Sequence, residues 1–123
     1  MTIREAIVRT DGLKHNTYTD GEKVKWLAVL DGMVKRLIID THEGGGNVFY
    51  TSYDAQTSPE LELLVPPPFD EIYLRWLEAQ IDYANGEYHK YNNSIAMYQA
   101  LWDAYRNHYN RRAMPMATAI RYY

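Results

Sequence analysis

The residues best suited to chemistry are four histidines, yet their spacing does not predict a metal site. His42 lies in the run Asp40-Thr41-His42-Glu43, which holds three potential ligands within four residues. At one helix end these side chains would point in different directions, so we do not expect them to share a metal ion. No two histidines form the HExxH pattern of zinc proteases. The absence of cysteine also excludes disulfides and cysteine-ligated metals.

Two pairs of carboxylates are the remaining candidates for acid–base catalysis. Asp70 and Glu71 are adjacent, and Glu78 and Asp82 have the i,i+4 spacing of one helix face. Because charged side chains are mostly exposed, we predict that Glu78 and Asp82 form a solvated helix surface. The glycines of EGGGN, residues 43–47, lack the Lys-Ser/Thr of a phosphate-binding loop, and we predict a hinge there. The sequence therefore predicts no enzyme and no cofactor.

The composition is that of a folded domain with an uneven distribution of charge. The chain has 123 residues, 46% of them hydrophobic, which is enough for one domain with a modest core. Residues 104–123 contain four arginines and no acidic residue, whereas residues 1–103 contain nine of the 13 basic residues and all 16 acidic ones. Arginines are favoured near a helix C-terminus by its dipole. The alternative is a basic tail that docks on an acidic partner or on nucleic acid.

Neither a membrane-spanning segment nor a secretory leader is predicted. No run of the sequence approaches 18 apolar residues, which a spanning helix requires. The first residues, MTIREAIVRTDG, lack the charged and then apolar regions of a secretory signal. We therefore expect synthesis in the cytoplasm and no membrane partner.

Two helix starts near the N-terminus are marked by capping boxes. Thr2 is followed three residues later by Glu5, and Thr19 is followed by Glu22. We predict a short helix after Thr2 that ends at Asp11-Gly12, and a long helix after Thr19 that continues to about residue 43. The long helix is apolar on two sides, which is typical of a helix packed between neighbours or buried in an assembly.

The second half of the chain predicts two further helices joined by a tight turn. Apolar residues repeat at helical spacing over 69–84 and again over 88–110. Asn85-Gly86 between them is a turn signal, so we expect an antiparallel pair. Residues 43–65 contain short β-prone runs and turn residues, which fit a protruding loop or a β-hairpin.

Together these patterns predict a mainly α fold. We expect a small antiparallel helical bundle of three long helices and one short helix, with an inserted loop or β-hairpin and an extended C-terminal tail. Residues 1–113 would form one domain. Residues 114–123 would form the tail, because Pro115 prevents the last helix from continuing.

The last predicted helix has an unusual apolar face, because most of its members are tyrosines. Tyrosine and tryptophan combine a large apolar area with a polar group and are enriched at protein interfaces. One explanation is an aromatic core whose hydroxyls reach solvent. The other is a face with core on its inner edge and a subunit contact on its outer edge. This tyrosine seam steps by three and four residues and consists of Tyr88, Tyr91, Ile95, Tyr98, Trp102, Tyr105 and Tyr109.

Several long segments resemble a protein family. The segments LLVPPPFDE, AQIDYANGEYHKYNNS and HYNRRAMP carry the resemblance, which covers residues 2–43 and 62–115. They are similar to small head–tail connector proteins, also called adaptor or head-completion proteins, of tailed bacteriophages and prophages of Gram-positive bacteria.

The resemblance implies a structural role in the virion. Such a protein forms a ring beneath the portal vertex, and its partners would be the portal protein, copies of itself and a tail-proximal neck protein. It would be made in the host bacterial cytoplasm and would reside in the neck, and no catalytic residue comes with the family. The predicted interface residues are Tyr98, Trp102, Tyr105, Tyr109, Arg111 and Arg112 in the last helix, Ile120, Arg121, Tyr122 and Tyr123 in the tail, and Val48, Phe49 and Tyr50 in the middle segment.

An alternative is a small helical phage protein with a regulatory or DNA-associated role. Tyrosines beside arginines can stack on bases. However, the seam has core spacing, the net charge is −3, and no helix–turn–helix with a basic recognition helix is present. We therefore treat contact with packaged DNA as a secondary property of the basic tail.

Overall fold

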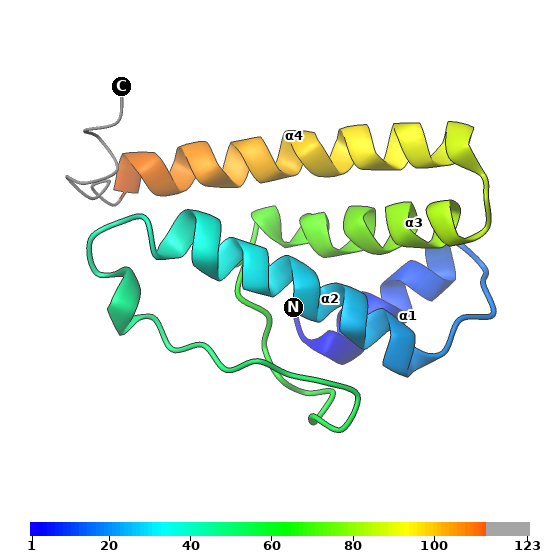
Figure 1. Ribbon diagram of the computed structural model, residues 1–123, viewed down its shortest axis with the longest axis horizontal. Coiled ribbons are helices and arrows are strands. Elements are labelled where there is room, and N and C mark those ends of the chain that lie inside the picture. Colours follow the sequence, from blue (N-terminus) through cyan, green and yellow to red (C-terminus); the bar gives the residue numbers. More distant parts are fainter. Residues whose placement is uncertain (113–123) are drawn as a thin grey trace.

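The fold is built from four α-helices, which the computed structural model describes for residues 1–112 (Figure 1). They are α1 (Ile3–Leu13), α2 (Asp20–Val34), α3 (Ile72–Ala84) and α4 (Tyr88–Arg112). The mainly helical prediction is confirmed. The division into three long helices and one short helix is not, because α1 with 11 residues and α3 with 13 are similar in length. The predicted tail, residues 114–123, lies outside the described residues.

Threonine caps begin the first two helices as the sequence predicts. The Thr2 hydroxyl accepts a hydrogen bond from the Glu5 backbone N–H at 3.1 Å, and the Glu5 carboxylate accepts one from the Thr2 N–H at 3.2 Å. The Thr19 hydroxyl accepts from the Glu22 backbone N–H at 3.2 Å, but the Glu22 carboxylate makes no return bond, so only the first predicted capping box is complete. These bonds satisfy N–H groups that the first turn of a helix leaves without partners.

A turn of π-helix extends α2 by five residues. This turn, η1 (Lys35–Ile39), is closed by the Asp40 N–H, which donates to the Lys35 carbonyl at 2.8 Å. The helix therefore ends at residue 39 and not near residue 43. Gly44 follows with φ 81°, a left-handed conformation that glycine adopts at little cost.

Helices α3 and α4 form the predicted antiparallel hairpin. Gly86, with φ 74°, makes the turn between them. Helix α3 makes its most extensive contact with α4, and it also contacts α1 and α2, which lie on its other side in Figure 1. Helix α3 is therefore the centre of the fold, and Ile72, Tyr73, Leu74, Leu77 and Ile81 are all fully buried.

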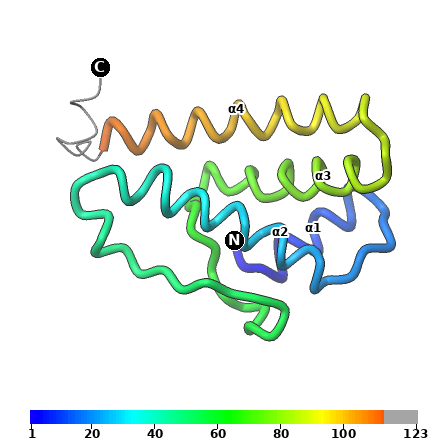
Figure 2. Tube along the Cα trace, viewed as in Figure 1, coloured from blue at the N-terminus to red at the C-terminus, as the bar shows by residue number. Residues whose placement is uncertain are grey.

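Residues 43–65 form a loop, so the β-hairpin alternative is wrong. Figure 2 shows this segment leaving the end of α2 and returning past the N-terminal residues. Its only helical turn is η2 (Gly45–Asn47). The Ile3 N–H donates to the Leu61 carbonyl at 3.1 Å, and the Leu63 N–H donates to the Met1 carbonyl at 2.9 Å. Backbone hydrogen bonds within the loop are confined to local turns, such as that from the Thr57 N–H to the Asp54 carbonyl at 3.0 Å.

The glycine run is a packed turn rather than the predicted hinge. Gly45 is buried, and a Cβ at this position would lie 2.1 Å from the Ile39 carbonyl oxygen. Gly46, in contrast, has nothing within 4 Å of its would-be Cβ. The glycine at 45 is therefore required by the close approach of the chain to the end of η1.

Candidate interaction surface

The tyrosine seam of α4 packs onto the body of the fold from Ile95 to Tyr109, whereas Tyr88 at its start is 60% exposed. Tyr98 and Tyr105 are 5% and 3% exposed, whereas Trp102 and Tyr109 are only half-buried. Ring centroids lie 4.9 Å apart for Tyr98 and Trp76 of α3. Of the predicted interface residues on α4, Tyr98 and Tyr105 are thus the least available to a partner, and Trp102 and Tyr109 present the accessible edge.

The hydroxyls of the buried seam tyrosines make no hydrogen bond within the described residues. Burial raises the pKa of Tyr98 to about 12, and burial together with the neighbouring Tyr109 raises the pKa of Tyr105 to about 12. Thr10 Oγ1 is the one fully buried side-chain polar atom without a partner among residues 1–112. The two hydroxyls therefore keep some contact with solvent, as expected for amphipathic rings at the rim of a core.

A pocket at the C-terminal end of α4 gathers three of the predicted interface residues. Its cavity of about 260 Å³ is lined by Pro66, Tyr105, His108, Tyr109 and Arg112. We call it the α4-end pocket. Aromatic walls beside a guanidinium suit an acidic or aromatic side chain of a protein partner, because arginine binds carboxylates and stacks on rings.

The α4-end pocket is held rigid from two sides. The Phe69 ring lies 5.7 Å from the Tyr105 ring and 4.9 Å from the His108 ring, centroid to centroid. On the other side, the His42 ring lies 4.8 Å from the Tyr109 ring, and its Nε2 lies 2.6 Å from Asn110 Oδ1. Two separate segments therefore fix the end of α4.

The polar residues 40–43 help to hold the end of α4 against the core. His42 is 4% exposed, and its Nδ1 lies 2.6 Å from the Ile38 carbonyl oxygen. Asp40 pairs with Lys35, which also donates to the Gly45 carbonyl at 3.0 Å. Within residues 1–112, no three histidine or acidic side chains converge in a way that would hold a metal ion.

The middle-loop residues that were predicted to contact a partner differ in exposure. Phe49 is 83% exposed, the most exposed large hydrophobic side chain of the described residues. Val48 is half-buried against the core, and Tyr50 is half-buried with its hydroxyl oxygen 3.8 Å from the position of a Cβ on Gly32. Phe49 is therefore the part of this loop that is available to a partner.

A buried carboxylate that the sequence analysis did not identify fastens the loop. Asp31 of α2 is 1% exposed and accepts hydrogen bonds from the Tyr73 hydroxyl at 2.6 Å and the Tyr53 hydroxyl at 2.9 Å. The Tyr73 hydroxyl in turn accepts from the Val65 N–H at 2.7 Å. Burial raises the pKa of Asp31, although the hydrogen bonds, chiefly that from Tyr73, oppose the shift. These bonds hold the loop on α2 and α3.

The prediction that Glu78 and Asp82 form a solvated surface is wrong. They are 8% and 0% exposed. Asp82 accepts from the Lys14 ammonium at 2.6 Å and from the Ser94 hydroxyl at 2.9 Å. Buried charges are tolerated when they are paired in this way. Asp82 thus joins α3 to α4 and to the segment after α1, whereas Glu78 pairs with Arg75 of the same helix at 3.2 Å. Both roles are structural.

The remaining predicted interface residues lie at the end of α4 or beyond it. Arg111 is exposed at the end of α4, and Ile120, Arg121, Tyr122 and Tyr123 lie outside the described residues.

No described helix is long and apolar enough to cross a membrane. No protein-family model, curated protein or solved structure matches the chain.

Proposed function

We propose that this protein is a structural component of a phage virion, a head–tail connector that forms a ring beneath the portal and joins capsid to tail. The sequence resemblance supplies this class. The observation that carries the proposal is the presence of two unlike contact surfaces, the α4-end pocket and the exposed Phe49 of the middle loop. A connector binds unlike partners, the portal and its neighbours in the neck, and therefore needs more than one kind of contact surface.

The chemistry of the α4-end pocket supports a protein partner with an acidic contact. Arg111 and Arg112 form no ion pair with a described residue, whereas Arg106 pairs with Asp103. We therefore assign the portal protein to the end of α4. The tail-proximal neck protein would contact the opposite side of the ring.

The composition of purified particles tests this assignment. Quantitative mass spectrometry should find this chain in copy number close to that of the portal protein. Absence of the chain from particles would contradict a structural role.

A pair of charge variants tests the portal contact. The double variant Arg111→Glu/Arg112→Glu should weaken capture of the chain by purified portal at least tenfold, because it places like charges opposite an acidic contact. Lys25→Glu is the matched control, since Lys25 is also exposed and has no ion pair within residues 1–112. Equal effects of the two changes would show that the basic end of α4 is not the contact.

The unpaired arginines also favour one alternative, a small helical regulatory or DNA-associated phage protein. In that case binding to duplex DNA should fall steeply as salt rises, because phosphate contacts release counterions. Binding that the same double arginine variant abolishes would support this alternative.

A further inference from the structure

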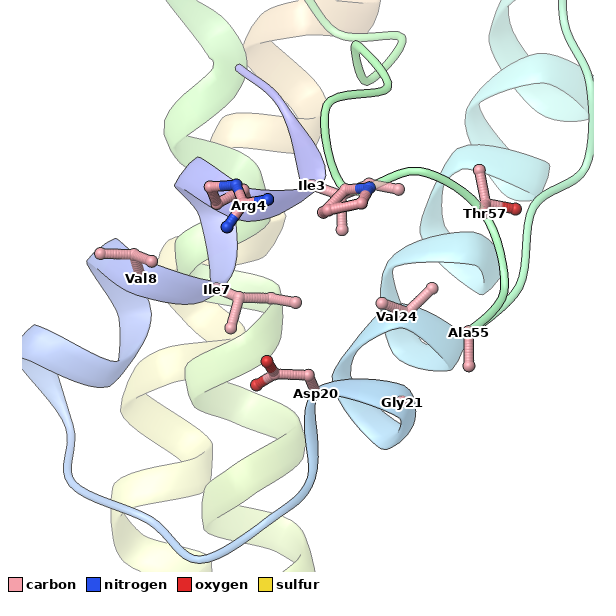
Figure 3. A pocket seen from close by; sticks show the side chains of 10 residues that line it. Ile3, Arg4, Ile7, Val8, Asp20, Gly21, Val24, Ala55 and Thr57 are labelled. Carbon is pink, nitrogen blue, oxygen red and sulfur yellow. The ribbon is translucent and has the colours of Figure 1, made fainter.

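A second pocket lies between the first two helices and the middle loop. Its cavity of about 300 Å³ has a floor of Ile3 and Ile7 from α1 and Val24 from α2. Figure 3 shows Ile7 of α1 facing Val24 of α2, with Ala55 and Thr57 of the loop beyond Val24. We call this the α1–α2 pocket. Its floor would accept an apolar side chain.

The rim of the α1–α2 pocket carries negative charge that the chain itself does not neutralise. Asp20 lines the pocket, is exposed, and forms no hydrogen bond or ion pair through its side chain with any described residue. Arg4 also lines the rim, but its guanidinium pairs with Glu60 at 2.5 Å. Glu22 and Asp54, which adjoin the pocket residues Gly21 and Ala55, are exposed as well. An occupant should therefore combine an apolar side chain with a positive charge.

The π-helical turn η1 presents this combination on the surface. Leu37 is 55% exposed, and its neighbour Arg36 is exposed without an ion pair among residues 1–112. A π-helical turn is rare and is frequently found at functional sites. The turn places an apolar anchor and an unpaired guanidinium side by side.

One molecule cannot bring these two features together. Asp20 begins α2 and Leu37 lies in its π-helical extension, so about 17 residues of continuous helix, roughly 25 Å, separate them. We propose that η1 of one copy docks in the α1–α2 pocket of a second copy, with Leu37 on the apolar floor and Arg36 paired with Asp20. Opposite charges on pocket and anchor give the contact its direction.

The docking is heterologous, so successive copies assemble head to tail. Such a contact closes into a ring when the rotation between copies allows it, and otherwise extends as a filament. It would supply the contact between copies in the proposed connector ring. Only this role in a ring rests on the proposed function. The contact itself can be measured on the purified chain without portal protein or particles.

Sedimentation velocity of the purified chain, over roughly 1 µM to 1 mM, should show reversible self-association. Leu37→Asp should weaken it at least tenfold, because it places a charge on the apolar floor. Val29→Asp is the matched control, since Val29 is equally exposed at 55% on the same helix, and it should leave association unchanged. Circular dichroism would confirm that both variants keep the helical fold.

A charge exchange separates direct pairing from a general charge effect. Asp20→Arg and Arg36→Asp should each weaken association several-fold. Mixing the two single variants should restore association, because each copy then meets the opposite charge on the other copy at both contacts. Ala55→Trp, at the pocket rim, should block association without touching either charge.

A wild-type chain that stays monomeric up to 1 mM would overturn the proposal, as would equal losses for Leu37→Asp and Val29→Asp. Failure of the α1–α2 contact remains distinguishable from failure of the connector function. Particles that contain the chain in portal-like copy number, and that tolerate Leu37→Asp, would place the ring contact elsewhere. A chain that associates through this pocket but is absent from particles would leave the contact intact and reject the connector role.

Discussion

The middle loop and helix α4 are attached to the core in opposite ways. The loop has almost no regular structure, yet Tyr53 within it, with Tyr73 of α3, donates to the buried carboxylate of Asp31. Helix α4 has 25 residues, of which only Ser94, Tyr98 and Tyr105 are buried, and the two tyrosine hydroxyls have no partner among residues 1–112. Regular secondary structure is thus a poor guide to where buried polar bonds are made. We expect the loop to be held by the Asp31 bonds. We expect α4 to be held by ring burial, together with the Ser94–Asp82 bond and the contact of His42 with Asn110.

The largest effect should come from removing the carboxylate that fastens the loop. Asp31→Ala leaves the Tyr53 and Tyr73 hydroxyls and the Leu64 N–H without their acceptor. We expect a loss of about 3–5 kcal/mol in the free energy of unfolding, measured by urea denaturation. Asp103→Ala is the control, because its exposed pair with Arg106 should contribute less than about 1 kcal/mol. Similar losses for both would contradict this view of the loop.

The next effect concerns the glycine turn at the start of the loop. Gly45→Ala places a methyl group where the Ile39 carbonyl oxygen lies, and should cost about 2–4 kcal/mol in the free energy of unfolding. Gly46→Ala, with open space around its Cβ, should change that free energy by less than about 1 kcal/mol. Thermal unfolding of the two variants measures the difference. Equal stability would show that the turn relaxes easily.

A smaller effect should appear at alkaline pH in α4. The folded-state pKa of Tyr98 is raised to about 12, above its ordinary value near 10, so the unfolded chain releases this proton first. Stability from this group is therefore complete below pH 10 and is lost as pH rises towards 12. Part of this stabilisation should therefore be lost by pH 11. Unfolding of Tyr98→Phe should show less alkaline destabilisation than the wild type, and identical pH profiles would contradict burial of this side chain.

The smallest effect should come from the seam hydroxyls at neutral pH. Tyr98→Phe and Tyr105→Phe keep the buried rings and remove hydroxyls that have no described partner. Each should change the free energy of unfolding by less than about 0.5 kcal/mol. A loss above about 1.5 kcal/mol in urea denaturation would reveal a hydrogen bond that this account lacks.

Local signals in the sequence were sufficient for the starts of α1 and α2 and for the turn between α3 and α4, but not for the end of α2. The threonine caps at Thr2 and Thr19 and the turn at Gly86 depend on neighbouring residues only, so the pattern of types predicted them. The spacing of the tyrosine seam likewise placed its members on one face of α4, with Tyr98 and Tyr105 turned inward.

Contacts between residues far apart in the chain could not be predicted from local sequence patterns. Asp82 is neutralised by Lys14, 68 positions away, and Asp31 is bonded to Tyr73, 42 positions away. A buried carboxylate is indistinguishable from a solvated one until its partners are known, which is why Glu78 and Asp82 were assigned to the surface. The packing of Gly45 against Ile39 also depends on the π-helical end of α2, which no local residue pattern predicts.

The most direct test of the contrast between loop and helix compares two tyrosine hydroxyls in parallel. Tyr73→Phe removes a donor to Asp31 and the acceptor of the Val65 N–H, whereas Tyr98→Phe removes a hydroxyl without a described partner. Urea denaturation at pH 7 should show Tyr73→Phe less stable than the wild type by about 2–4 kcal/mol, and Tyr98→Phe unchanged within about 0.5 kcal/mol. Equal losses in the two variants would contradict the account, because they would show that the Asp31 bonds do not distinguish the loop from α4.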